Sequence, residues 1–185
     1  MPNTSAHAQS DYQVRLEWGE AGLARLAPAD VVVVVQTLGL TAHALSACEH
    51  GAGLDLTDDA DAAASLARAA EAAGAHVVIG GLRNAAAVAA HVMAVQHERG
   101  ARTSISVIAA GSVDDADAAG VRFAVDDLLG AGAVVAALGA LVLAFAEVFS
   151  IYLVPSYLTA AVGFVLLVVV LIVRPAGLFG QRELT

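Results

Sequence analysis

The stretch from Gly80 to Asn84 is the part of this sequence best suited to binding an anion. Gly80 and Gly81 follow an apolar run, and Arg83 and Asn84 lead into an alanine-rich segment with helical character. Glycines let the backbone approach a ligand, N–H groups at a helix start point outward, and a guanidinium offers paired donors to phosphate or carboxylate. The stretch predicts a phosphate-binding loop made of Gly81, Arg83 and Asn84. The alternative is an ordinary strand-to-helix turn with a surface arginine.

A second set of candidate ligands is acidic. Asp126 and Asp127 are adjacent, and Asp114, Asp115 and Asp117 precede them in a glycine-bounded loop. Carboxylate oxygens are the hard ligands that Mg²⁺ prefers. The pattern predicts a magnesium site at Asp126 and Asp127, and the alternative is a group of solvated acids on a helix and a loop.

The elements that must position these residues alternate between strand and helix. Val31–Val35 is a run of five valines, which is typical of a buried central strand in a parallel sheet. Further strands are expected at 76–79, 103–110 and, from alternation, 13–18; helices are expected at 20–26, 41–50, 62–73, 85–99 and from 123 onward. The pattern predicts a small three-layer parallel-sheet α/β domain over residues 12–127, preceded by a disordered N-terminus (1–11). Ligands of such sheets bind at the carboxyl ends of the strands.

The C-terminal part of the chain is far more apolar. Residues 128–146 and 152–173 are uncharged runs of 19 and 22 residues, each able to span about 30 Å of hydrocarbon as a helix. Pro155 lies between them, and Arg174 follows the second run. The pattern predicts a two-helix transmembrane hairpin over 128–174 and a short tail over 175–185. It also predicts a cytoplasmic domain anchored to the inner (cell) membrane.

Charge divides the chain in the same way. The net charge is −9, and residues 1–127 carry all of it, with seven of the nine basic and 16 of the 18 acidic residues. Because no basic patch is available to neutralise phosphates, nucleic acid is excluded as a partner.

Five blocks of sequence carry a resemblance to a known family. YQVRLEWGEAG, APADVVVVVQTL, GGLRNAAAVA, ARTSISVIAAG and RFAVDDLLGAGAVVAAL occur in this order over residues 12–137. Together they resemble the 2-phosphosulfolactate phosphatase family. The resemblance implies a Mg²⁺-dependent phosphatase acting on a small phosphate ester of a sulfonated hydroxy acid, a three-layer α/β fold and homodimers. The positions that match the family's functional residues are Thr41 and Glu49 as catalytic groups, Arg83 and Asn84, and the metal ligands Asp126 and Asp127.

Two departures from the family pattern favour a second hypothesis. Gln36 stands where the family has an aspartate after the valine-rich strand, and an amide is neither an anionic ligand nor a base at neutral pH. The section between His50 and His76 is also several times shorter than in the family. The alternative to an active phosphatase is therefore a non-catalytic remnant or a chimera.

The C-terminal segment resembles another family. The stretch GALVLAFAEVFSIYLVPSYLTAAVGFVLLVVVLIVRPAGLFGQRE is similar to the end of the branched-chain amino acid transporter permeases of the LivH type. The match covers only the last two helices of a much longer permease, and a transport path needs the rest of the bundle. A permease fragment that assembles with a transporter is the third hypothesis.

Overall fold

The computed structural model of the chain describes residues 6–54, 56, 62–113, 121–153, 164–165, 168–169 and 172. The chain divides into two compact units, residues 1–137 and residues 138–185. The expected domain boundary after Asp127 lies inside a helix, so the first unit extends ten residues further than the sequence suggested.

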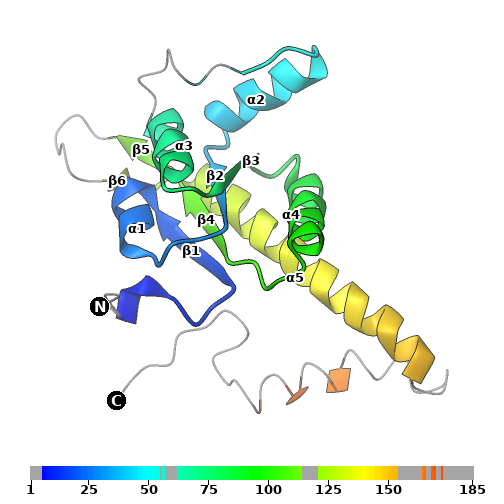
Figure 1. The fold of residues 1–185 in the computed structure, drawn as a ribbon. Coiled ribbons are helices and arrows are strands. Elements are labelled where there is room, and N and C mark those ends of the chain that lie inside the picture. Colours follow the sequence, from blue (N-terminus) through cyan, green and yellow to red (C-terminus); the bar gives the residue numbers. More distant parts are fainter. Residues whose placement is uncertain are drawn as a thin grey trace. The chain divides into compact units, whose positions relative to one another are not determined.

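The first unit is an α/β domain built on one parallel sheet (Figure 1). The described residues form strands β1 (Val14–Trp18), β2 (Val31–Val35), β3 (His76–Gly80), β4 (Ile105–Ala109), β5 (Ser112–Val113) and β6 (Val121–Arg122). The helices are η1 (Ala6–Ala8), α1 (Gly19–Arg25), α2 (Leu40–Glu49), α3 (Ala62–Ala72), α4 (Ala85–Arg99) and α5 (Val125–Leu153). The main sheet has the order β1-β4-β2-β3 with all neighbours parallel, and β5 and β6 form a separate antiparallel pair. The expected parallel-sheet α/β fold is confirmed.

Strand β2 is the centre of the core. Its five valines are at most 1% exposed, and full burial of each contributes roughly 1.5–3 kcal/mol. Because side chains alternate along a strand, Val32 and Val34 pack with the alanine-rich face of α3 on one side of the sheet. Val33 and Val35 face the other side, where Gly80 and α5 approach them.

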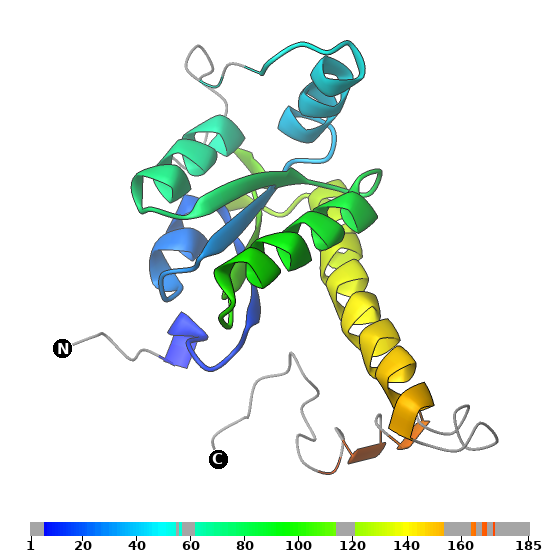
Figure 2. The same cartoon turned by 45° about the vertical axis from the view of Figure 1, so that its right-hand side comes forward.

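Helices cover both faces of the sheet in three layers. α1 and α3 lie together on one face, and α4 and the first turns of α5 lie on the other (Figures 1 and 2). The chain steps from β2 outward to β3 through α3, and it steps back across β2 to β4 through α4. Because crossover connections keep one hand, this reversal of direction places α4 on the face opposite α3.

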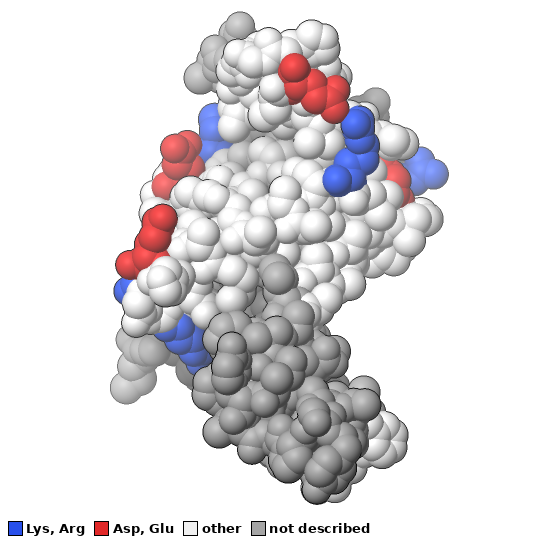
Figure 3. Space-filling view, turned by 90° about the vertical axis from the view of Figure 1, so that its right-hand side faces the viewer, with Lys and Arg blue, Asp and Glu red and all other residues white. Residues whose placement is uncertain are grey.

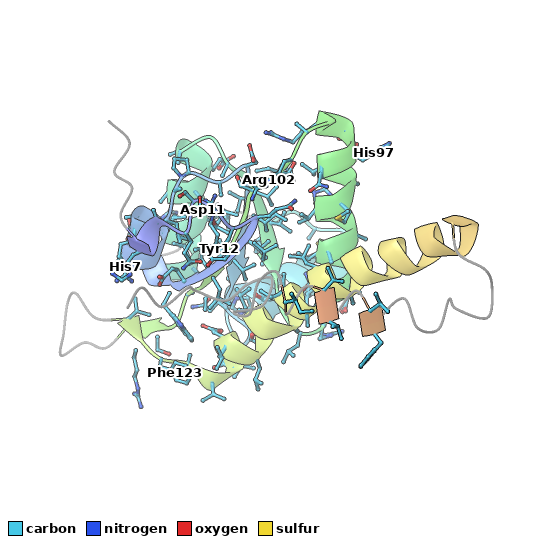
Figure 4. All side chains as sticks on the ribbon, turned by 90° about the horizontal axis from the view of Figure 1, so that it is seen from below. His7, Asp11, Tyr12, His97, Arg102 and Phe123 are labelled. Carbon is cyan, nitrogen blue, oxygen red and sulfur yellow. The ribbon has the colours of Figure 1, made fainter. Side chains whose placement is uncertain are left out.

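The N-terminal segment is more ordered than the sequence suggested. The expected disorder over residues 1–11 is wrong for its described part, since residues 6–8 form η1 and Ala8 is 5% exposed. The Ala27 N–H donates to the Ala8 carbonyl at 2.9 Å. Arg102 donates to the carbonyl of Asp11 at 3.2 Å, and the two residues lie near each other in Figure 4. A polar composition hid these backbone contacts.

A buried arginine ties this segment to the domain. Arg15 on β1 is 5% exposed, and its guanidinium donates to the carbonyls of Tyr12 at 3.1 Å and Ala27 at 2.7 Å. Burial lowers the pKa of Arg15, with Arg102 acting in the same direction and Asp30 opposing it. The carbonyl acceptors compensate the desolvation of the charge.

The predicted transmembrane hairpin is not supported. The helix expected from 123 onward and the first apolar run, 128–146, form one continuous helix, α5, which runs from Val125 to Leu153. Taken over the residues that the structure describes, no helix has both the length and the apolar composition that crossing a bilayer requires. The expected turn at Pro155, most of the second run and residues 175–185 lie outside the described residues.

Asp30 links the start of β2 to the loop before β4 and makes stability depend on pH. Its carboxylate accepts from the Ser104 N–H and hydroxyl, both at 2.7 Å, and pairs with Arg99. The two Ser104 bonds, and then Arg99 and Arg15, lower the pKa of Asp30, while burial opposes them. Asp30→Asn is therefore expected to lower the free energy of unfolding by about 1–2 kcal/mol at neutral pH, measured by urea titration.

The sign of the pH effect follows from the lowered pKa. A carboxyl whose pKa is depressed in the folded state contributes its full stabilisation above its unfolded value of about 3.9, and loses it as the pH falls through the folded value. The difference between wild type and Asp30→Asn should therefore shrink in acid below about pH 4. Asp11→Asn, at an exposed acid, is the control. A difference that stays constant down to pH 2 would contradict this account.

Candidate functional site

The carboxyl ends of the parallel strands gather the residues of the candidate site along one edge of the sheet. Three loops leave this edge: Gln36–Gly39 after β2, Gly81–Asn84 after β3, and Ala110–Gly111 after β4. β2 connects onward to α3 and β3 to α4, on opposite faces of the sheet (Figure 2). Loops that diverge in this way mark the position where open α/β sheets bind ligands.

A buried carboxylate joins two of these loops. Asp127 is 1% exposed and lies in the first turn of α5. Its Oδ1 accepts from the Thr37 N–H at 2.7 Å, and its Oδ2 accepts from the Gly111 N–H at 2.8 Å. Charge-assisted bonds of this kind are stronger than neutral ones, and a helix N-terminus favours a negative charge. Asp127 therefore holds the ends of β2 and β4 against the start of α5.

The first turns of α5 pack closely onto the same edge. Asp127, Gly130, Ala131 and Val134 recur at helical spacing and are all buried. A Cβ on Gly130 would come within 2.8 Å of Val35 Cγ1 and would also collide with the Thr37 hydroxyl, so only glycine fits there. The Thr37 hydroxyl donates to the carbonyl of Asp126 at 2.8 Å. Thr37 is thus bound to α5 through both its backbone and its side chain.

Gly111 allows the chain to turn at the end of β4. Its φ of +70° is in the left-handed region, and an added Cβ would come within 2.8 Å of the Arg122 carbonyl. The turn lets β5 pair with β6, which is followed by Phe123. The Phe123 ring lies 5.0 Å from that of Trp18 at the end of β1, measured between centroids. Figure 4 shows Phe123 at this end of the domain.

Thr41, which the family resemblance marks as catalytic, is a buried residue at this edge of the sheet. It is 2% exposed, and its hydroxyl donates to the Gly80 carbonyl at 2.8 Å and accepts from the Gln36 N–H at 3.2 Å. A Cβ on Gly81 would lie 2.8 Å from Thr41 Cγ2, so the start of α2 and the loop after β3 are in direct contact. A hydroxyl used in this way connects the loops after β2 and β3, and a catalytic role would require these bonds to open.

Gln36, in the loop after β2, binds the first turn of helix α2. Its side-chain Oε1 accepts from the Leu40 N–H at 2.7 Å, and this N–H belongs to the first residue of the helix. The amide thereby meets one of the unsatisfied donors of a helix start.

Arg83 and Glu49 form an ion pair at the surface of the domain. The Arg83 guanidinium lies 3.0 Å from Glu49 Oε1, and the two side chains are 74% and 59% exposed. The pair joins the loop after β3 to the last residue of α2. On the face drawn in Figure 3, charged side chains are sparse and lie mainly toward the edges of the described surface. Two predicted site residues from distant parts of the sequence are therefore brought together.

Asn84 precedes helix α4. Its amide donates to the Ile79 carbonyl at 2.9 Å, and its side chain makes no capping bond to the helix. Its buried Oδ1 has no hydrogen-bond partner among the described residues. The first N–H groups of α4 are therefore left uncapped by Asn84.

The predicted magnesium pair, Asp126 and Asp127, fits this geometry only in part. N–H donors face both oxygens of Asp127, which suits an anionic acceptor better than a metal ligand, and Asp126 lies about 100° away around the helix. Within the described ranges, no group of three or more His, Cys, Asp or Glu side chains could hold a metal ion. Asp114, Asp115 and Asp117 lie outside the described residues. Magnesium binding at this pair stays a prediction.

Comparisons of the chain with protein-family models, with curated proteins and with solved structures gave no match. The geometry of the strand ends and the sequence resemblance are therefore the grounds on which a function can be proposed.

The Asp127 bonds can be tested by replacing its carboxylate with an amide. Asp127→Asn keeps the size of the side chain, but its NH₂ group would face one of the two backbone N–H donors. A buried donor without an acceptor costs about 1–3 kcal/mol. We expect a loss of this size in the free energy of unfolding, measured in urea by the fluorescence of the single tryptophan, Trp18.

Asp126→Asn is the matched control. The side chain of Asp126 is half-buried, and only its backbone carbonyl takes part in the contact with Thr37. Its substitution should change the free energy of unfolding by no more than about 0.5 kcal/mol. Equal effects at the two positions would show that Asp127 is not the structural carboxylate.

Proposed function

We propose that the first unit, residues 1–137, binds a small phosphate ester at the carboxyl-end edge of its sheet. The observation that carries the proposal is the loop Gly81–Asn84, which joins the end of β3 to the start of α4 and presents Arg83. The side chain of Asn84 does not cap this helix start. Backbone N–H groups at a helix start and a guanidinium together form a common arrangement for phosphate recognition. The resemblance to 2-phosphosulfolactate phosphatases supports the same class of ligand.

The Arg83–Glu49 ion pair supports this proposal because it is easily exchanged. An exposed ion pair stabilises a protein by about 0–1 kcal/mol. A phosphate ester carries more charge than a carboxylate and can accept two parallel bonds from one guanidinium. Binding of the ester at Arg83 would therefore displace Glu49. The hydrogen bonds of the buried Thr41 and Asp127 would stay in place.

We propose binding as the function and treat hydrolysis as an outcome of the test. The Thr41 hydroxyl and the Asp127 carboxylate are engaged by backbone groups, and Gln36 offers no negative charge. Glu49 is the remaining candidate for a catalytic group, since its exposed carboxylate lies beside Arg83.

The test is titration calorimetry of the full chain in detergent with inorganic phosphate and a panel of small phosphate esters, with and without Mg²⁺. Arg83→Gln should weaken binding by about tenfold to a hundredfold, the equivalent of one lost charge-assisted hydrogen bond. Glu49→Gln should retain or strengthen binding, because it removes the competitor for Arg83. Arg25→Gln is the control, since Arg25 is an exposed arginine in a similar ion pair with Glu17 at 3.4 Å.

The same samples are assayed for release of phosphate. Mg²⁺-dependent release that falls in Glu49→Gln would establish a phosphatase in which Glu49 is catalytic. Binding without release would establish a binding domain. If the wild type binds no ester, or if Arg25→Gln weakens binding as much as Arg83→Gln does, the proposal is wrong.

We also propose that the C-terminal apolar segment attaches the chain to a membrane, on the basis of its sequence alone. The run over 152–173 has no charged residue. The full chain expressed in bacterial cells should stay in the membrane fraction after a carbonate wash. Leu167→Arg combined with Val168→Arg should release it, since an arginine inside a span costs up to about 2.5–3.5 kcal/mol. Equal retention with the conservative pair Leu167→Met and Val168→Ile is the control, and a wild type found in the wash would contradict attachment.

A further inference from the structure

Two histidines meet at the end of the domain opposite the candidate site. His76 is the first residue of β3, and His91 lies in the middle of α4. Their Nε2 atoms are 2.9 Å apart, and their ring centroids are 5.1 Å apart with the planes tilted by 37°. Both side chains are exposed, so a solvated ion can reach them.

The fold brings these residues together although 15 positions separate them. β3 is an edge strand, and α4 returns along it after the loop Gly81–Asn84. From the turn, the strand extends about 13 Å back to His76 at roughly 3.3 Å per residue, and the helix extends about 9 Å to His91 at 1.5 Å per residue. Strand and helix therefore carry the two imidazoles to a similar depth, on elements whose backbones are fixed by hydrogen bonds.

The short distance limits what can lie between the rings. Two Nε2 atoms at 2.9 Å cannot both carry a proton directed at the other, so one of them presents a lone pair. The pair holds either one shared proton or, if both nitrogens are unprotonated, a metal ion. Imidazole nitrogen binds zinc, nickel and copper well, whereas Mg²⁺ and Ca²⁺ require oxygen ligands.

We propose that His76 and His91 form a two-histidine site for a divalent transition-metal ion of the Zn²⁺ or Ni²⁺ class. With metal–nitrogen bonds of about 2.0–2.1 Å, tetrahedral coordination places two ligand nitrogens about 3.3 Å apart. The rings would have to separate by a few tenths of an ångström and turn so that their lone pairs converge. Two exposed side chains can do this by rotation alone. Water fills the remaining positions of the metal.

The neighbouring acid does not complete the site in this arrangement. The His76 N–H donates to the Asp30 carbonyl at 2.9 Å, but the Asp30 carboxylate is bonded to Ser104 and Arg99. The ion would therefore join α4 to the edge strand β3 with positions left open to solvent. Such a link binds the folded chain more strongly than the unfolded chain, in which the two imidazoles are apart, and it therefore stabilises the fold as the metal concentration rises.

The experiment is titration calorimetry of the untagged full chain, stripped with a chelator, using zinc chloride and then nickel chloride. One ion should bind per chain at this site. His76→Ala and His91→Ala should each weaken this binding by at least about tenfold, because one remaining imidazole cannot chelate. The double variant should therefore lose little more affinity than either single variant. His97→Ala is the control, since His97 is an exposed histidine on the same helix, labelled in Figure 4.

Thermal unfolding gives a second readout, which reports on binding that stabilises the fold and not on weak binding of zinc to other histidines. Zinc should raise the midpoint in the wild type and in His97→Ala, and it should leave the midpoint of both site variants unchanged. Equal binding in the wild type and His76→Ala, loss of binding in His97→Ala, or no bound ion in the wild type would each overturn the proposal.

Discussion

The bonds of Asp127 to two backbone N–H groups are the constraint on which the geometry of the site depends. The β2 and β4 ends are neighbours in the sheet, and a single carboxylate in the first turn of α5 accepts from the residues that follow both. This fixes the direction in which α5 leaves the sheet and brings Gly130 against Val35. A charge buried in this way is stabilising only because hydrogen-bond donors meet both of its oxygens. The N–H groups of Thr37 and Gly111 are therefore as much a part of the site as the acid itself.

Buried side chains that bind backbone groups hold the loops of the site in place. A weak, exposed ion pair lies at the surface of the site. Thr41 joins the loops after β2 and β3, and Thr37 joins the loop after β2 to α5. The side chains of Arg83 and Glu49 are exposed. The arrangement separates the residues that set the geometry from those that are able to exchange partners with a ligand.

The sequence predicted the strands and helices well where one physical signal dominates. The valine run specified a strand buried on both faces, and the glycines at 74, 80 and 100 marked the ends of elements within a few residues. The order of the strands was not available from the sequence, because the pairing of β1 with β4 joins residues that are far apart along the chain. The role of Asp127 was also hidden, since a structural acceptor and a metal ligand are the same residue type at the same helix position. The hairpin was predicted from the length of the apolar runs alone. The first run instead continues the helix that begins at Val125, whose early turns are buried against the sheet.

The two histidines show a limit of motif reasoning that is physical in origin. Metal sites are recognised in sequence when ligands share one element, because helical spacing of three or four residues places them on one face. His76 and His91 lie on a strand and on a helix, and their distance depends on the length of the intervening turn and on the packing of α4 over β3. One residue more in the loop Gly81–Asn84 would rotate the start of α4 by about 100° and carry His91 away from the strand. The same loop therefore sets two features at opposite ends of β3. It presents Arg83 at the carboxyl end, and through the phase of α4 it determines whether the imidazoles meet at the amino end.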